Sequence, residues 1–189
     1  MKDYIINYFK SASDNFLKLE NQCDNISEAI SKIYESLLEK NKIIFCGNGG
    51  SASDSQHLAA ELVGRYKIDR DPLAAISLAV DTSALTAIGN DYGYEQIFSR
   101  QLAAIGNSGD VLVAISTSGE SKNILRAVEM ARNMQIFTIA LTGEKKSSLS
   151  NVVNLSINVP SNETNHIQEM HIAIGQLICG VIEDKFFKK

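Results

Sequence analysis

The chain has 189 residues, a hydrophobic content of 44%, a formal net charge of −4 and an isoelectric point near 5.4. A chain of this size and composition can bury a core of its own as one domain, without metal or disulfide support. The net negative charge argues against nucleic acid or an anionic membrane as a partner, because proteins that bind those surfaces usually carry net positive charge.

Apolar residues recur three and four positions apart over residues 2–20 and 22–40, which predicts two amphipathic helices. Four short apolar runs then predict buried parallel strands: "KIIFCGNGG" (42–50), "AAISLAV" (74–80), "DVLVAISTSG" (110–119) and "IFTIALTG" (136–143). Helical periodicity lies between them, at roughly 53–66, 82–89, 94–105 and 120–133. "VVNLSINVP" (152–160) predicts one more strand, and residues 163–187 predict the closing helix.

This alternation of strands and helices predicts an α/β fold with a doubly wound, mostly parallel sheet. We expect one domain over residues 1–189, made of a helical pair (1–40) and an α/β core with a C-terminal helix (41–189). The N-terminus lacks the apolar run of a signal peptide and no window reaches transmembrane length, so a cytoplasmic location is expected. Cys23, Cys46 and Cys179 are far apart without a CxxC spacing, which is typical of reduced, packed thiols.

Glycine and hydroxyl residues follow two of the predicted strands, where ligands bind in open parallel sheets. In "GNGGSASDSQHLAAE" the glycines allow a tight turn ahead of Ser51, at the start of a helix whose free N–H groups can bind an anion. "STSGES" offers the hydroxyls of Ser116, Thr117, Ser118 and Ser121 at the start of another helix. Neither loop is a Walker motif or a GxGxxG dinucleotide fingerprint. Either loop alone is equally well explained by serines that cap helices, but two such loops together favour a phosphate site.

"HLAAE" places His57 and Glu61 four residues apart, on one face of a helix. Such a pair can bind a metal, or the carboxylate can abstract a proton while the imidazole orients it. Spacing alone favours the plainer interpretation, a hydrogen bond on the helix surface. Asn90 and Asp91, in "AIGNDYGYEQIF", are residue types that favour turns.

Four separated motifs, "CGNGGSASDSQHLAAELVGRY", "AIGNDYGYEQIFSRQ", "GDVLVAISTSGES" and "IQEMH", together resemble the phosphoheptose isomerases, which are sugar isomerase (SIS) domain proteins. The resemblance covers nearly the whole chain. It implies a three-layer sandwich around a five-stranded parallel sheet, a homotetramer with active sites near subunit interfaces, and conversion of sedoheptulose 7-phosphate to D-glycero-D-manno-heptose 7-phosphate for bacterial lipopolysaccharide or capsule.

The resemblance also assigns site residues by motif. It implies phosphate binding by Ser116, Thr117, Ser118 and Ser121, with Asn48, Gly49, Gly50 and Ser51 nearby, and it places Arg65, Asn90, Asp91 and Gln168 around the substrate. Glu61 is the expected base, because isomerisation through an enediol needs a group that moves a proton between C1 and C2.

Zinc is the cofactor that the resemblance implies, with His57, Glu61 and Gln168 matching three of its ligands. The family usually places a fourth ligand, a histidine also proposed for acid–base work, eight residues after the glutamine, where this chain has Gln176. A glutamine offers a carbonyl oxygen to a metal but exchanges no proton near neutral pH. His171 does not replace that histidine, because a helix separates positions 171 and 176 by roughly 140° around its axis.

Two further functions are weighed against the isomerase. Some SIS proteins that associate with the bacterial replication initiator share "IQEMH" and lack the later histidine, so a non-catalytic partner-binding role is the main alternative. This chain keeps the isomerase form of the glycine loop, of Glu61 and of "STSG", which favours the enzyme. A phosphosugar sensor is the third hypothesis, although the sequence contains no DNA-binding domain.

Overall fold

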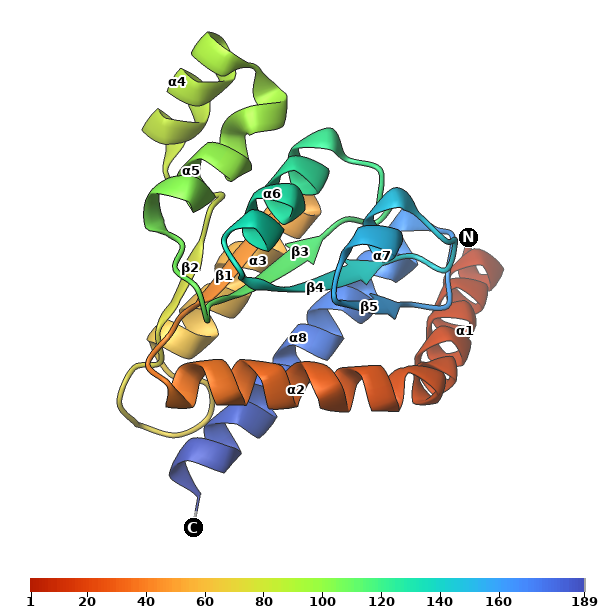
Figure 1. Ribbon diagram of the computed structural model, residues 1–189. Coiled ribbons are helices and arrows are strands. Elements are labelled where there is room, and N and C mark those ends of the chain that lie inside the picture. Colours follow the sequence, from red (N-terminus) through yellow and green to blue (C-terminus); the bar gives the residue numbers. More distant parts are fainter. Residues whose placement is uncertain (189) are drawn as a thin grey trace.

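A computed structural model describes residues 1–188 and has one five-stranded, fully parallel sheet at its centre (Figure 1). The strands are β1 (Ile43–Gly47), β2 (Ala75–Ser77), β3 (Val111–Ile115), β4 (Phe137–Thr142) and β5 (Leu155–Asn158), and their order in the sheet is β2-β1-β3-β4-β5. β1 and β3 are fully buried, as their apolar runs predict. The predicted doubly wound α/β fold is therefore confirmed, with the sheet winding in both directions from β1.

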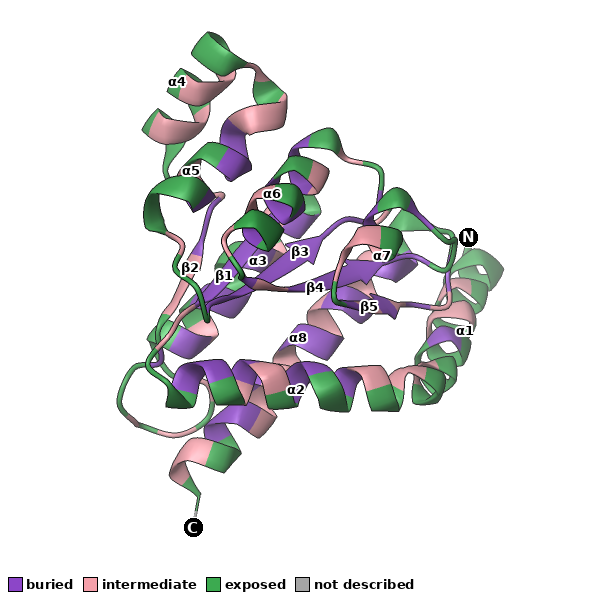
Figure 2. Ribbon diagram, in the orientation of Figure 1, coloured by how far each residue is buried: buried purple, intermediate pink, exposed green. Residues whose placement is uncertain are grey.

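The helices cover both faces of the sheet and make three layers. They are α1 (Lys2–Lys18), α2 (Cys23–Leu38), α3 (Gly50–Val63), α4 (Thr82–Tyr92), α5 (Ile97–Ile105), α6 (Lys122–Asn133), α7 (Ser148–Val152) and α8 (Thr164–Phe187), with short 3₁₀ turns at Leu19–Gln22 (η1) and Tyr94–Gln96 (η2). Alternate strand residues point to opposite faces, so Phe45 packs with the core of α2, α3 and α8, whereas Ile44 packs with α5 and α6. Figure 2 shows the buried residues gathered on the sheet and on the helix faces turned toward it.

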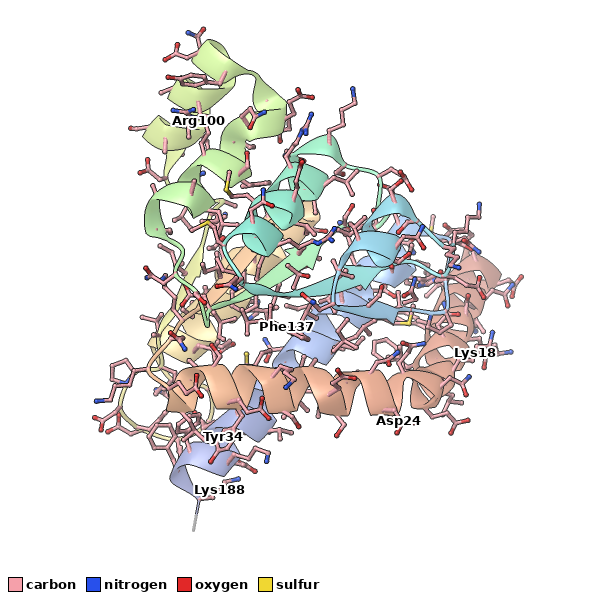
Figure 3. The ribbon with its side chains drawn as sticks, in the orientation of Figure 1. Lys18, Asp24, Tyr34, Arg100, Phe137 and Lys188 are labelled. Atoms are coloured by element: carbon pink, nitrogen blue, oxygen red, sulfur yellow. The ribbon has the colours of Figure 1, made fainter. Side chains whose placement is uncertain are left out.

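Two elements lie partly outside this core. In Figure 1 α1 stands at one end of the molecule and α4 projects from the other, and α4 contains no buried residue. Figure 3 labels Arg100 of α5, whose guanidinium lies 3.6 Å from the centroid of the Tyr92 ring at the end of α4. None of the described helices is long and apolar enough to cross a membrane.

The observed elements differ from the predicted ones in two places. β2 is only three residues long, because it lies at the edge of the sheet and pairs with β1 alone. The predicted strand 152–160 is shorter, because the five-residue helix α7 ends at Val152 and β5 starts at Leu155. Ser147 and Ser150 form a capping box at the start of α7, in which the side chain of each serine accepts a hydrogen bond from the backbone N–H of the other. Apolar periodicity does not detect such a motif.

Candidate active site

The two predicted loops lie side by side because their strands are neighbours. Gly47 at the end of β1 is in register with Ile115 at the end of β3. The chain leaves β1 toward β2 on one side and β3 toward β4 on the other, so the gap between these strand ends is the switch point of the sheet. Ligands of open α/β sheets bind at such a point.

The first loop brings its backbone close to any ligand at this point. Gly49 has φ of +55°, a conformation that side chains disfavour, and it precedes α3, which starts at Gly50. Ser51 is 3% exposed and lies in the first turn of α3, where its backbone N–H donates to the Asn48 carbonyl at 3.0 Å. The side chain of Asn48 exchanges hydrogen bonds with Asn123 of α6 and accepts one from the Tyr94 hydroxyl at 3.0 Å.

The second loop carries the four predicted hydroxyl residues around Gly119. The Ser116 hydroxyl accepts a bond from the Gly119 N–H at 3.1 Å and lies 3.4 Å from the Ser121 hydroxyl. Ser121 is the N-cap residue of α6, but its side chain makes no capping bond, so its hydroxyl is available to a ligand. Thr117 and Ser118 line an adjacent pocket with Lys145, whose positive charge sequence reasoning did not single out.

Three polar side chains converge farther along α3. Nε2 of His57 lies 2.9 Å from Oε1 of Glu61, as their four-residue spacing predicts. The Gln176 amide nitrogen of α8 lies 2.8 Å from Nε2 of His57 and 3.3 Å from Oε1 of Glu61. The side chains of His57 and Glu61 are 51% and 20% exposed, so water reaches both. We call these three residues the His57–Glu61–Gln176 cluster.

Close packing of α8 on α3 brings Gln176 to the pair. Gly175 faces Leu58, and any Cβ at position 175 would overlap the Leu58 methyl groups. Because glycine removes that atom, the two helices approach and the next residue reaches His57 and Glu61. Gln168 meets α3 at a different level, since a Cβ at Gly50 would lie 2.5 Å from its Nε2. Gly50 and His57 are seven residues apart, roughly 10 Å along the helix axis, so Gln168 contacts the backbone of α3 about two turns before His57.

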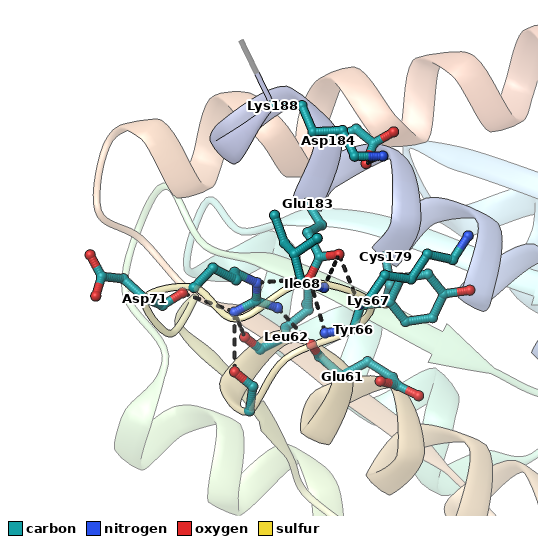
Figure 4. A network of polar contacts seen from close by, with 12 residues as sticks. Glu61, Leu62, Tyr66, Lys67, Ile68, Asp71, Cys179, Glu183, Asp184 and Lys188 are labelled. Atoms are coloured by element: carbon teal, nitrogen blue, oxygen red, sulfur yellow. Dashed lines mark hydrogen bonds and ion pairs between the residues drawn. The ribbon is translucent and has the colours of Figure 1, made fainter.

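A buried ion pair fixes the end of α3 next to Glu61 (Figure 4). Nε of Arg70 lies 3.1 Å from Oε2 of Glu183, and both side chains are 1% exposed. The remaining Arg70 nitrogens donate to backbone carbonyls that include Glu61 and Leu62 at the end of α3. Glu183 accepts from the backbone N–H groups of residues 66, 67 and 68. Burial raises the pKa of Glu183, but these hydrogen bonds outweigh it and leave the pKa below its ordinary value.

His171 lies away from the cluster and is fully buried. Its Nε2 lies 3.2 Å from the carbonyl oxygen of Thr142 at the end of β4, and burial lowers its pKa to about 4 while this bond opposes the shift. The ring is therefore neutral near pH 7 and donates to the Thr142 carbonyl. Its role on α8 is to hold the helix against the sheet.

Comparison with known proteins identifies the family. A model of the SIS domain matches residues 7–143. The phosphoheptose isomerase of Akkermansia muciniphila is 52% identical over 187 residues, which are 99% of each chain. The chain belongs to the phosphoheptose isomerase family.

Solved phosphoheptose isomerase structures share the whole fold. The enzyme from Neisseria gonorrhoeae superposes with a TM-score of 0.91 at 39% identity, covering 97% of this chain and 98% of that one. The enzyme from Francisella tularensis gives a TM-score of 0.93 at 38% identity, covering 96% and 97%. The three-layer sandwich expected from the resemblance is thus present, and the partner-binding alternative is not favoured.

Three residues that the phosphoheptose isomerase motifs place around the substrate are exposed and are not hydrogen-bonded to the loops or the cluster in residues 1–188. Asn90 and Asp91 are exposed at the end of the projecting helix α4, and Asn90 donates to Asp91 at 2.8 Å. Arg65 is exposed in the turn after α3. Sequence reasoning missed the contacts of Asn123, Tyr94 and Arg70, because no local pattern links residues so far apart in the chain.

Proposed function

We propose that this protein is an aldose–ketose isomerase that converts sedoheptulose 7-phosphate to D-glycero-D-manno-heptose 7-phosphate. One observation carries the proposal: the helix that starts in the glycine loop also holds Glu61 in the polar cluster. One rigid element thereby joins an anion site to a carboxylate that can move a proton. Heptose produced in this way would supply a bacterial surface polysaccharide, lipopolysaccharide or capsule.

The two loops would bind the phosphate group. Ser116 and Ser121 have hydroxyls 3.4 Å apart, and α3 and α6 begin at these two loops with the positive ends of their helix dipoles. Thr117, Ser118 and the ammonium of Lys145 line the neighbouring pocket. This arrangement holds an anion locally in a chain whose net charge is −4.

Glu61 would act as the base of the isomerisation. Its carboxylate removes a proton from C1 of the ketose while the carbonyl oxygen O2 gains one, which gives a 1,2-enediol. It then returns the proton to C2 while O1 loses its proton, which leaves the aldehyde at C1. His57, 2.9 Å away, orients the carboxylate and can serve the substrate oxygens, because an imidazole exchanges protons near neutral pH. Exposure of His57 allows that exchange to involve water.

We also propose a cytoplasmic homotetramer whose sites lie near subunit interfaces. Helix α1 exposes large apolar side chains, among them Tyr4, Phe9 and Leu17, which are 76%, 67% and 70% exposed. Such apolar faces are typical of association surfaces. Asn90 and Asp91 are exposed at the end of α4, where a neighbouring copy can reach them.

Turnover by the purified protein tests the proposed function. Sedoheptulose 7-phosphate is incubated with the protein, with and without added zinc, and the aldose product is followed by NMR. Glu61→Gln keeps the size of the side chain and removes its basicity, so it should abolish turnover while the fold is retained. Absence of turnover by the wild-type chain under both conditions would refute the isomerase.

A further inference from the structure

The His57–Glu61–Gln176 cluster bears on whether a metal ion is needed, and this inference rests on the proposed function. Zinc in proteins is held by cysteine, histidine, aspartate and glutamate, usually four ligands in structural sites and three in catalytic ones. The cluster offers one imidazole and one carboxylate, and its third member is an amide. Across residues 1–188, no group of three or more His, Cys, Asp or Glu side chains is placed to hold a metal.

The other predicted ligand, Gln168, is also an amide. Gln168 lies against Gly50 at the start of α3, whereas the cluster lies about two turns farther along the helix. Its amide is also a weaker and harder donor than imidazole or thiolate, and amide oxygens suit Mg²⁺, Ca²⁺ or Mn²⁺ better than zinc. The residues present therefore do not fit a tight zinc site.

Gln176 instead satisfies the pair by hydrogen bonding. An amide has two N–H donors and a carbonyl acceptor, so it can donate to an unprotonated His57 ring or, after rotation, accept from a protonated one. It also lies within 3.3 Å of Oε1 of Glu61. The amide N–H can donate to the Glu61 carboxylate without exchanging a proton itself, which leaves proton transfer to Glu61 and His57.

We infer that Gln176 is a positioning residue that aligns Glu61 with His57 by hydrogen bonds, and that this cluster does not depend on a tightly bound zinc ion. The tight contact between Gly175 and Leu58 holds Gln176 in place.

Zinc binding by the purified chain tests the inference independently of turnover. The metal content is measured by mass spectrometry, and zinc affinity is measured by competition with a chromophoric chelator. Wild-type protein should carry substoichiometric zinc. Gln176→His adds an imidazole to the cluster and should raise zinc affinity by about tenfold or more, on the scale of changes around a metal. Leu177→His is the matched control: it adds the same ring to the same helix at a side chain 52% exposed, and should leave affinity unchanged.

Gln176→Leu separates positioning from ligation. It should leave zinc affinity at the wild-type value and lower kcat more than it raises KM, because substrate still binds while Glu61 loses its alignment. Gln176→Glu, whose carboxylate has no N–H to donate and repels Glu61, should not recover the loss. Stoichiometric zinc in the wild-type protein, or its loss in Gln176→Leu, would overturn the inference. Failure of all variants to turn over sedoheptulose 7-phosphate would count against the proposed function alone, because the zinc measurements need no activity.

Discussion

Replacing Glu183 with glutamine should destabilise the protein strongly. The carboxylate is 1% exposed and accepts four hydrogen bonds, one from the Arg70 guanidinium at 3.1 Å and three from the backbone N–H groups of residues 66–68. The variant leaves the Arg70 charge buried without its counter-ion, and its new NH₂ group faces donors. Breaking a buried ion pair in this way costs about 3–5 kcal/mol.

Urea unfolding followed by circular dichroism measures this cost, at one fixed protein concentration because association adds to apparent stability. Asp184→Asn is the matched control. Asp184 is the next residue on α8, and its pair with Lys188 at 2.7 Å is about half exposed, so its loss should cost less than about 1 kcal/mol. A cost below about 1 kcal/mol for Glu183→Gln, or equal costs for the two variants, would refute the structural role given to the Arg70–Glu183 pair.

Three further predictions concern other parts of the molecule. Stability should fall by up to about 3 kcal/mol as the pH drops from 6.5 toward 4, because His171 has an ordinary pKa of 6.5 in the unfolded state, whereas burial keeps its pKa at about 4 in the folded state. His171→Asn should lack this dependence when thermal unfolding is measured across that pH range. Gly175→Ala should cost about 1–3 kcal/mol through overlap with Leu58 and should lower kcat by displacing the next residue; denaturant unfolding and a kinetic assay check both effects. Ser121→Ala should raise KM for the sugar phosphate and leave the unfolding midpoint unchanged, because Ser121 makes no capping bond; an altered midpoint with unchanged KM would contradict this.

The sheet could be predicted because its strands carry a local signal. Buried parallel strands are continuous apolar runs, and β1, β3 and β4 fall inside the runs named from the sequence. The true ends of β2 depend on its place at the edge of the sheet, and α7 depends on a serine capping box in only five residues. Neither property is a periodic pattern.

The candidate site was predictable where it is local. The spacing of His57 and Glu61 places them together on one helix, and the glycine and serine loops follow strands that were themselves predictable. The contact of Gln176 with this pair joins residues 119 positions apart and depends on the glycine next to it, which lets two helices approach. Pairing of Arg70 with Glu183 likewise links positions 113 apart, so no motif points to it.

Solvent exchange at the reacting carbons tests the central claim most directly, that Glu61 moves a proton between C1 and C2. Sedoheptulose 7-phosphate is incubated with the protein in D₂O, and deuterium at C1 of the recovered ketose and C2 of the aldose is followed by NMR. Wild-type protein should introduce deuterium at C2 of the product, because a carboxylate open to water exchanges its proton. Glu61→Gln should introduce none. Deuterium incorporation by Glu61→Gln at the wild-type rate would contradict the account.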